Sequence, residues 1–197
     1  FLAPVPYSSS VYLFTEAIIN YGTDEIKKDI LPKLVSGEIV GTLGVTEELH
    51  APTKDNINLV YADGKINGKK IAVPDAGVAT HAVVVAKSDK GISLQLVDLS
   101  TTGVTVEHQE NIDESRGHFS ISFNDVETKL LGDKVSGWEL YETLINQAAV
   151  LFSYEQIGGS QASLDMAINY AKERYAFGRP IGSYQAIKHK LADMYIA

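Results

Sequence analysis

The hydrophobic period of this chain changes twice, and no other feature of the sequence limits the fold more. Apolar residues recur at helical spacing up to Gly37, at alternate positions from Glu38 onward, and at helical spacing again after Gly132. A period near 3.6 residues indicates helices and a period near 2 indicates strands. The sequence therefore predicts an α+β, multi-domain fold with helices at 1–37, a β domain at 38–132 and helices at 133–197.

Two short helices are predicted in the first region. One ends at Gly22, and the other begins after Thr23, whose hydroxyl can cap it, and closes at Gly37. Pro32 should kink the second helix or mark its last turns. Helices this short cannot bury their apolar sides alone, so we expect them to pack on a segment that precedes Phe1 or follows Ser36.

The middle region contains several short strand-like runs separated by turn chemistry. The pairs Asp63-Gly64 and Asn67-Gly68 are typical of hairpin turns. Short strands at this spacing predict a β-sandwich or barrel. The predicted strands cover residues 39–45, 57–61, 71–73, 82–86, 92–99, 104–107 and 119–123.

The last region predicts one long helix followed by a shorter one. From about Trp138 to Tyr175 a helix would be roughly 55 Å long at 1.5 Å per residue. Gly158-Gly159 in its middle lowers helix propensity, which is usually accepted where another backbone comes close, so we expect an intersubunit helix crossing there. A second helix is predicted from Ser183 to Ala197, and because its pattern has no cap we expect the protein to continue with further helices.

The break between these two helices carries the residues most suggestive of a binding site. Arg174 and Phe177 lie three residues apart, so on a helix end they would share a face, and Gly178 with Pro180 would then stop the helix. The Arg guanidinium matches phosphate oxygens, and a ring beside it can pack on a base or flavin. Spacing alone favours a plainer alternative, in which Arg174 pairs with a surface carboxylate and Phe177 fills the core.

Four separated stretches together resemble the acyl-CoA dehydrogenase family. The run YAKERYAFGRPIGSYQAIKHKLADM from Tyr170 resembles that family's R-x-x-F-G…Q segment. The stretches YGTDEIKKDILPKLVSGE at 21–38, GVTEE at 44–48 and INGKK at 66–70 agree with it in order and spacing. The resemblance extends over nearly all 197 residues, and the agreement of four segments makes it specific.

The resemblance implies a flavoprotein oxidoreductase that uses FAD to desaturate the Cα–Cβ bond of an acyl-CoA thioester. It places Thr46 at the subunit's own flavin and Arg174, Phe177, Gly178 and Gln185 at the flavin of a neighbouring subunit. The implied partners are an acyl-CoA substrate, identical or homologous subunits in a tetramer, and an electron-transfer acceptor protein. The implied location is the bacterial cytoplasm, or the mitochondrial matrix in a eukaryote. Fatty-acid and steroid side-chain substrates both remain open.

The sequence departs from the family at the positions that face the flavin. Pro52 stands where the family has a serine that helps to hold the thioester, and Ala72 and Pro74 replace a tryptophan and a hydroxyl residue that contact the ring. Ala148 stands where a minority of members carry the catalytic base, so no base is identifiable in this chain. We therefore expect a subunit that donates its Arg174 segment to a partner's flavin while its own flavin face is eroded.

Two other interpretations remain open. In one, the chain is part of a self-sufficient homotetrameric enzyme whose base lies in a part of the protein beyond this chain. In the other, it is a non-catalytic assembly protein of the same fold. Either would retain the helical surfaces, but only an enzyme requires the Arg174 segment.

Composition excludes several other classes of site. The chain has no cysteine, so disulfides, thiolate metal sites and a cysteine nucleophile are ruled out. Its net charge of −8, without a Lys/Arg stripe, argues against a nucleic-acid partner. No apolar run has the length of a membrane span. The five dispersed histidines argue against a metal site, and Glu47-Glu48 is better explained as a strand-end cap or solvated charges than as a catalytic pair.

Overall fold

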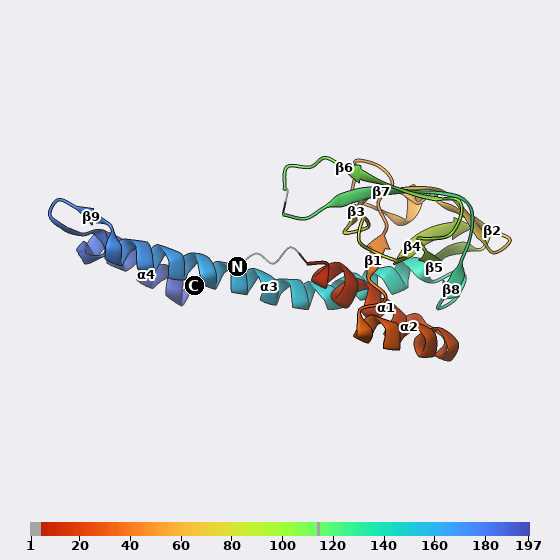
Figure 1. Ribbon diagram of the computed structural model, residues 1–197, viewed down its shortest axis with the longest axis horizontal. Helices are drawn as coiled ribbons and strands as arrows, with labels where there is room; N and C mark the ends of the chain where they lie inside the picture. Colours follow the sequence, from red (N-terminus) through yellow and green to blue (C-terminus); the bar gives the residue numbers. More distant parts are fainter. Residues whose placement is uncertain (1–4, 114) are drawn as a thin grey trace. The chain divides into compact units, whose positions relative to one another are not determined.

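A computed structural model describes residues 5–113 and 115–197, so the first four residues of the predicted N-terminal region lie outside it. The described chain divides into two compact units, one up to Ala149 and one from Val150 onward (Figure 1). The long helix α3 (Gly137–Glu173) begins in the first unit and ends in the second. The three predicted domains, 1–37, 38–132 and 133–197, remain a prediction for the whole protein.

The first unit opens with helical segments that match the predicted pattern. They are the π-helical segment η1 (Ser8–Thr15), α1 (Glu16–Tyr21) and α2 (Asp24–Ser36). The Thr23 hydroxyl accepts a hydrogen bond from the Ile26 amide at 3.3 Å, and Gly37 closes α2 at φ 77°, which confirms both predicted caps. Segment η1 packs on the first strand so closely that a Cβ on Gly41 would lie 2.0 Å from the Phe14 ring.

A mixed sheet of eight strands follows these helices in the first unit. Its main path runs β6-β7-β3-β2-β4-β5-β8, and β1 pairs with β4 in parallel. Every predicted strand overlaps an observed one, while the last strand was not predicted. The strands are β1 (Gly41–Gly44), β2 (Val60–Ala62), β3 (Lys65–Pro74), β4 (His81–Ser88), β5 (Gly91–Asp98), β6 (Val104–Gln109), β7 (His118–Glu127) and β8 (Lys129–Leu131).

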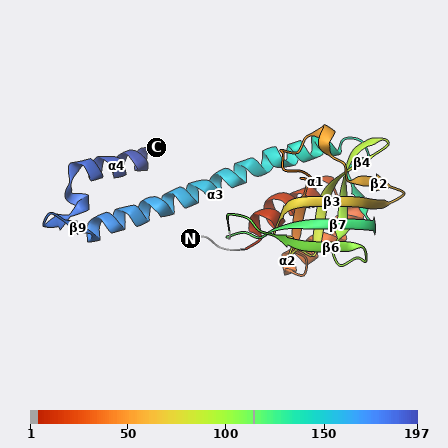
Figure 2. The ribbon, with the colours of Figure 1, turned by 90° about the horizontal axis from the view of Figure 1, so that it is seen from above.

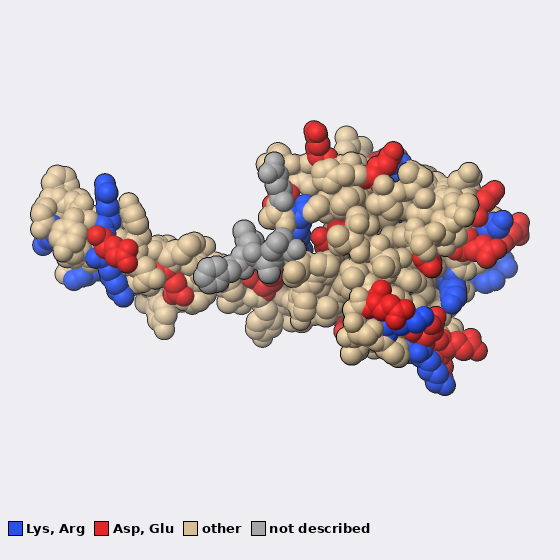
Figure 3. Space-filling view, viewed as in Figure 1, with Lys and Arg blue, Asp and Glu red and all other residues tan. Residues whose placement is uncertain are grey.

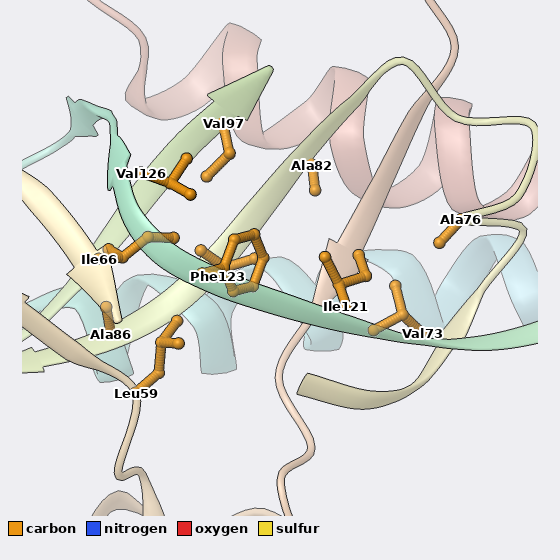
Figure 4. Close-up of a cluster of buried hydrophobic side chains, with 11 residues drawn as sticks. Leu59, Ile66, Val73, Ala76, Ala82, Ala86, Val97, Ile121, Phe123 and Val126 are labelled. Carbon is orange, nitrogen blue, oxygen red and sulfur yellow. The ribbon is translucent and has the colours of Figure 1, made fainter. Parts of the chain in front are cut away.

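The sheet curls around one apolar cluster. Side chains from β3, β4, β5 and β7 meet in it, although β7 and β5 lie near opposite ends of the strand order (Figure 4). Only a curled sheet can bring those strands together, as in the predicted sandwich or barrel. The cluster comprises Leu59, Ile66, Val73, Ala76, Ala82, Val84, Ala86, Val97, Ile121, Phe123 and Val126.

One of the two predicted turns is confirmed and the other is wrong. Asp63 and Gly64 form the two-residue turn between β2 and β3, with Ala62 paired to Lys65. Asn67-Gly68 instead lies inside β3, at an irregularity in its pairing with β7. The Asn67 amide oxygen accepts a hydrogen bond from the Asp125 backbone N–H at 2.8 Å, and its Nδ2 donates to the Asp125 carboxylate at 3.0 Å, so partners on β7 hold this segment in the strand.

The second unit contains the end of α3, a two-strand hairpin and a second helix (Figure 2). The hairpin pairs β9 (Tyr175–Ala176) with β10 (Arg179–Pro180), and the short 3₁₀ turn η3 (Ile181–Ser183) leads into α4 (Gln185–Ile196). The long helix and the final helix are thus confirmed within a few residues of their predicted bounds. In the described ranges, no helix combines the length and apolarity needed to cross a bilayer.

Candidate functional site

The segment around Phe177 is a hairpin, and this corrects the prediction that Arg174 and Phe177 share the face of a helix end. Helix α3 ends at Glu173, and Phe177 and Gly178 form a two-residue turn with φ of 52° and 80°. Positive φ at both central residues is the geometry that matches the twist of a tight hairpin. Gly178 takes this conformation without strain, whereas Phe177 does not.

Phe177 is also fully presented to solvent. Its exposed fraction is 95%, so the alternative that it fills the core of this chain is wrong. A large ring held in a strained backbone conformation at the tip of a hairpin gains nothing from its own chain. Such strain is usually kept where another surface uses the side chain.

Contacts from the start of α4 hold the hairpin in shape. The Tyr184 hydroxyl donates to the Ala176 carbonyl at 2.9 Å, and the Arg179 guanidinium lies 3.9 Å from the centroid of the Tyr184 ring. The Ile181 amide donates to the Arg174 carbonyl at 2.8 Å. The role of Tyr184 was not predicted, because its partners are set by the fold of the turn and not by helical spacing.

Arg174 and Gln185 bracket this hairpin. Arg174 follows the last residue of α3, Gln185 begins α4, and both are exposed. Within the part of the chain that the structure describes, the Arg174 side chain has no ion-pair or hydrogen-bond partner, so a surface carboxylate does not occupy it. Four predicted residues therefore lie at the hairpin and the two helix ends beside it, and the Arg174 guanidinium and the Phe177 ring are accessible. The four are Arg174, Phe177, Gly178 and Gln185.

The remaining predicted residue, Thr46, lies in the first unit beside the eroded positions. Its carbonyl accepts a hydrogen bond from the Ile71 amide at 2.8 Å. At the next residue, Ala72, the backbone adopts φ 51° in an irregular stretch of β3. Thr46 and Ala72 thus lie on neighbouring segments. We call the surface formed by Thr46, Ala72 and Pro74 the Thr46 face.

Two further backbone groups of the Thr46 face are bonded within the chain. The Ala72 amide donates to Gln109 Oε1 at 2.7 Å, and the Pro74 carbonyl accepts from the Thr42 hydroxyl at 2.6 Å. Pro74 has no N–H of its own. An amide could replace a lost side-chain contact to a flavin ring, but the Ala72 amide is engaged and Pro74 has none, so neither position makes up for its lost contact and the face fits a flavin ring poorly.

The other eroded positions offer no compensation. Pro52 lies in the loop between β1 and β2, next to the short turn η2 (Lys54–Asn56). Ala148 is buried on α3, with 1% of its surface exposed, and carries no ionisable group. No catalytic base is identified at these positions.

A buried ion pair lies directly behind the Thr46 face and was not predicted. Lys70 Nζ donates to Glu47 Oε1 at 2.6 Å and to the Val45 carbonyl at 2.9 Å. Burial lowers the pKa of Lys70 to about 8, while the nearby Glu47 carboxylate opposes that shift. The alternation of β3 places Lys70 on the same face as buried Ile66, which is the signal that sequence reasoning could have used.

Outside these two sites, the charged side chains in view carry both signs (Figure 3). Figure 3 shows acidic and basic side chains interspersed on the face in view. Among the described residues, no three His, Asp or Glu side chains converge as a metal site. A cleft of about 920 Å³ lies between α2 and the sheet, and its lining includes His81 and Asp98 but none of the predicted site residues.

Comparison with known proteins confirms the resemblance seen in the sequence. Residues 135–197 match the family model described as "Acyl-CoA dehydrogenase, C-terminal domain". A probable acyl-CoA dehydrogenase of Bacillus subtilis is 32% identical over 95% of this chain and 53% of its own length. The butyryl-CoA dehydrogenase structure from Megasphaera elsdenii has a TM-score of 0.88 at 27% identity, covering 96% of this chain and 53% of that one.

A third protein has a similar fold at a lower sequence identity. The glutaryl-CoA dehydrogenase of Mycobacterium smegmatis, solved in complex with FADH2, has a TM-score of 0.87 at 24% identity, covering 96% of this chain and 51% of that one. The fold of this chain, a mixed sheet with helices, is thus the acyl-CoA dehydrogenase fold. The chain spans about half the length of the relatives it matches.

Proposed function

We propose that this chain, a homologue of the acyl-CoA dehydrogenases, is part of a subunit of an FAD-dependent enzyme that introduces a double bond between Cα and Cβ of an acyl-CoA. The subunit donates its Phe177 hairpin to a flavin held mainly by a partner subunit. Its own Thr46 face binds flavin weakly or not at all. The working enzyme also requires an electron-transfer acceptor protein and is located in the bacterial cytoplasm or the mitochondrial matrix.

One observation carries the proposal. Among the described residues the Arg174 guanidinium has no partner, and the hairpin presents a 95% exposed, strained ring. The Thr46 face instead lacks the side chains that Ala72 and Pro74 replace and has its Ala72 amide engaged. If selection for flavin binding had been lost throughout the protein, substitutions would have removed the strained Phe177 turn as readily as the flavin contacts of the Thr46 face. Retention of one half beside loss of the other supports a division of labour between subunits.

The residues of this chain have defined tasks in such an enzyme. Arg174 would bind the flavin pyrophosphate through its planar fork, Phe177 would pack beside the flavin, and Gly178 would allow the turn that presents both. When bound, FAD would supply the acceptor for the hydride that leaves Cβ, which carries both electrons removed from the substrate. The carboxylate that takes the α-proton would come from a partner subunit or from a part of the protein beyond this chain.

The flavin content of the purified protein tests the division of labour. Expressed alone, the protein should carry little flavin and reduce no acceptor with any acyl-CoA. Co-expressed with a homologue that keeps the aromatic and hydroxyl flavin contacts, it should yield about one flavin per pair of chains. A flavin-replete, active homotetramer from this chain alone would instead establish the self-sufficient alternative.

Two matched variants test the role of Arg174 in the assembled protein. Arg174→Lys keeps the charge and loses the fork, so it should raise the flavin dissociation constant about tenfold, the equivalent of one charged hydrogen bond. Lys172→Gln removes a charge from the last turn of the same helix and keeps the fork, so it should leave flavin retention unchanged. Equal retention in both variants would favour the non-catalytic assembly protein.

A further inference from the structure

The buried pair behind the Thr46 face connects more of the chain than its two side chains. The exposed fractions of the Lys70 and Glu47 side chains are 0% and 8%. Glu47 Oε2 accepts the Asn58 amide at 2.7 Å, and Oε1 accepts the Leu59 amide at 3.0 Å. The Glu47 carboxylate therefore joins the end of β1, the approach to β2 and the middle of β3.

These bonds satisfy the condition under which a buried ion pair persists. Taking two charges out of water is costly unless further hydrogen bonds satisfy them. Here the carboxylate accepts from two amides besides the ammonium, and the ammonium has a carbonyl acceptor besides the carboxylate. Removing one partner would leave the other charge buried and would release all three segments.

The segments joined by the pair are the ones that carry the Thr46 face. Thr46 lies between Val45 and Glu47, and Lys70 Nζ binds both of these neighbours. Ile71, next to Lys70, donates its amide to the Thr46 carbonyl. The strained backbone at Ala72 follows directly, and strain of this kind needs rigid surroundings to persist.

We propose that Glu47 and Lys70 are a positioning pair that holds Thr46 and the Ala72 irregularity as one preformed face. The pair is too deeply buried to contact a ligand itself. The face therefore remains ordered although the flavin-contacting side chains that Ala72 and Pro74 replace are absent. This inference rests on the proposed function, because that function is what makes the face a former flavin surface.

A preformed face should regain flavin when contacts are returned to it. The test uses a restored-face variant, Ala72→Trp with Pro74→Thr, which supplies an aromatic ring and a hydroxyl. Titrated with FAD, this variant should quench flavin fluorescence, whereas the parent chain should not. Ala72 is exposed, so the larger side chain has room.

Lys70 and its neighbour Lys69 provide a matched pair of changes in the restored-face variant. Lys70→Met should weaken FAD binding at least tenfold, because the Thr46 and Ala72 segments lose their common anchor. Lys69→Met should change binding less than twofold, because Lys69 is exposed and its Nζ lies 3.8 Å from Glu107 at the surface. Amide exchange at Asn58 and Leu59 should accelerate only in the Lys70 variant.

A second variant keeps the test informative if Lys70→Met alone fails to fold. Glu47→Gln with Lys70→Met removes both buried charges and leaves an oxygen to accept from the Leu59 amide, so circular dichroism should show a retained fold while FAD binding is still lost. Unchanged FAD binding in that variant would overturn the positioning role. A restored-face variant that binds no FAD with the pair intact would do the same. Neither result affects the Arg174→Lys test, in which the Thr46 face is native.

Discussion

The two compact units of this protein differ in where their side chains find partners. In the unit up to Ala149, some buried polar side chains find hydrogen-bond partners within the unit. Lys70 is one of them, and the Ser9 hydroxyl, which donates to Asp75 at 2.6 Å, is another. The unit from Val150 onward buries few apolar side chains, among them Leu164 and Ala171. The residues it leaves exposed include Val150, Tyr154, Ile157, Met166, Tyr170, Phe177, Met194, Tyr195 and Ile196.

From this difference we expect the first unit to act as a scaffold and the second as a contact surface. Large apolar patches on a protein surface usually mark contacts with other chains. Because the second unit also carries the donor hairpin, the same region would serve both assembly and flavin binding. Substitutions in the first unit should therefore mainly lower the stability of the fold, and substitutions in the second should mainly weaken association.

The largest separation should come from one substitution made in each unit. Ile121→Ala empties a fully buried site on β7 and should lower the free energy of unfolding by about 2–5 kcal/mol. Ile157→Ala removes the same atoms from a position that is 63% exposed on α3 and should change it by no more than about 0.5 kcal/mol. Urea unfolding of the chain measures both. Similar losses in the two variants would contradict the division between scaffold and contact surface.

The paired glycines in α3 should show stability and association moving in opposite directions. A Cβ at Gly158 or Gly159 would meet nothing within 4 Å in this chain, so each change to alanine should favour the helix by about 1 kcal/mol. If another subunit's backbone crosses here, as the sequence predicts, the same changes should weaken the oligomer. Circular dichroism and sedimentation measure the two effects. A stronger or unchanged oligomer would remove the predicted helix crossing.

A smaller effect is expected at the tip of the hairpin. Phe177→Asn places a residue that tolerates positive φ in the turn and should relieve about 1 kcal/mol of local strain. Amide exchange in the hairpin should slow, while flavin retention by the assembled protein should fall. Tyr175→Asn, on the extended part of the hairpin, serves as the control and should not slow exchange. Faster exchange in Phe177→Asn would show that the ring stabilises its own chain.

The smallest effect should be a dependence of scaffold stability on pH at His81. Burial lowers the pKa of His81 below its usual 6.5, against the charges of Asp98 and Asp29, while Lys33 and Lys129 add to the decrease. Between the folded pKa and 6.5 the unfolded chain binds more protons, so stability falls as pH drops through that range. His81→Gln should flatten this part of the stability profile. A profile unchanged by His81→Gln would assign the dependence to other groups.

The sequence predicts local elements better than it predicts contacts between them. The helices at Asp24–Ser36 and Gly137–Glu173 follow from periodicity and caps, because both are properties of neighbouring residues. The turn at Asn67-Gly68 was predicted wrongly, because Asp125 on β7 bonds Asn67 and keeps it in the strand. Whether Asn67-Gly68 forms a turn or stays in a strand therefore depends on a residue 58 positions away.

The candidate site shows the same limit. The resemblance selected Arg174 and Phe177, but a helical interpretation of their spacing missed the hairpin that Gly178 and Tyr184 shape. The Glu47–Lys70 pair joins residues 23 positions apart, and no local pattern shows that they meet. Side chains whose partners come from another strand require the assembled sheet before their role is visible.

The parallel pairing of β1 with β4 has a consequence for synthesis of the chain on the ribosome. Gly41 lies opposite His81, so the first strand waits for its partner until roughly forty more residues have emerged. At about 5–20 residues per second, that interval lasts on the order of 2–8 s. During it the apolar faces of η1 and β1, including Phe14 against Gly41, have no sheet to cover them. We therefore expect the segment that holds η1 and β1 to be open to a chaperone during this interval.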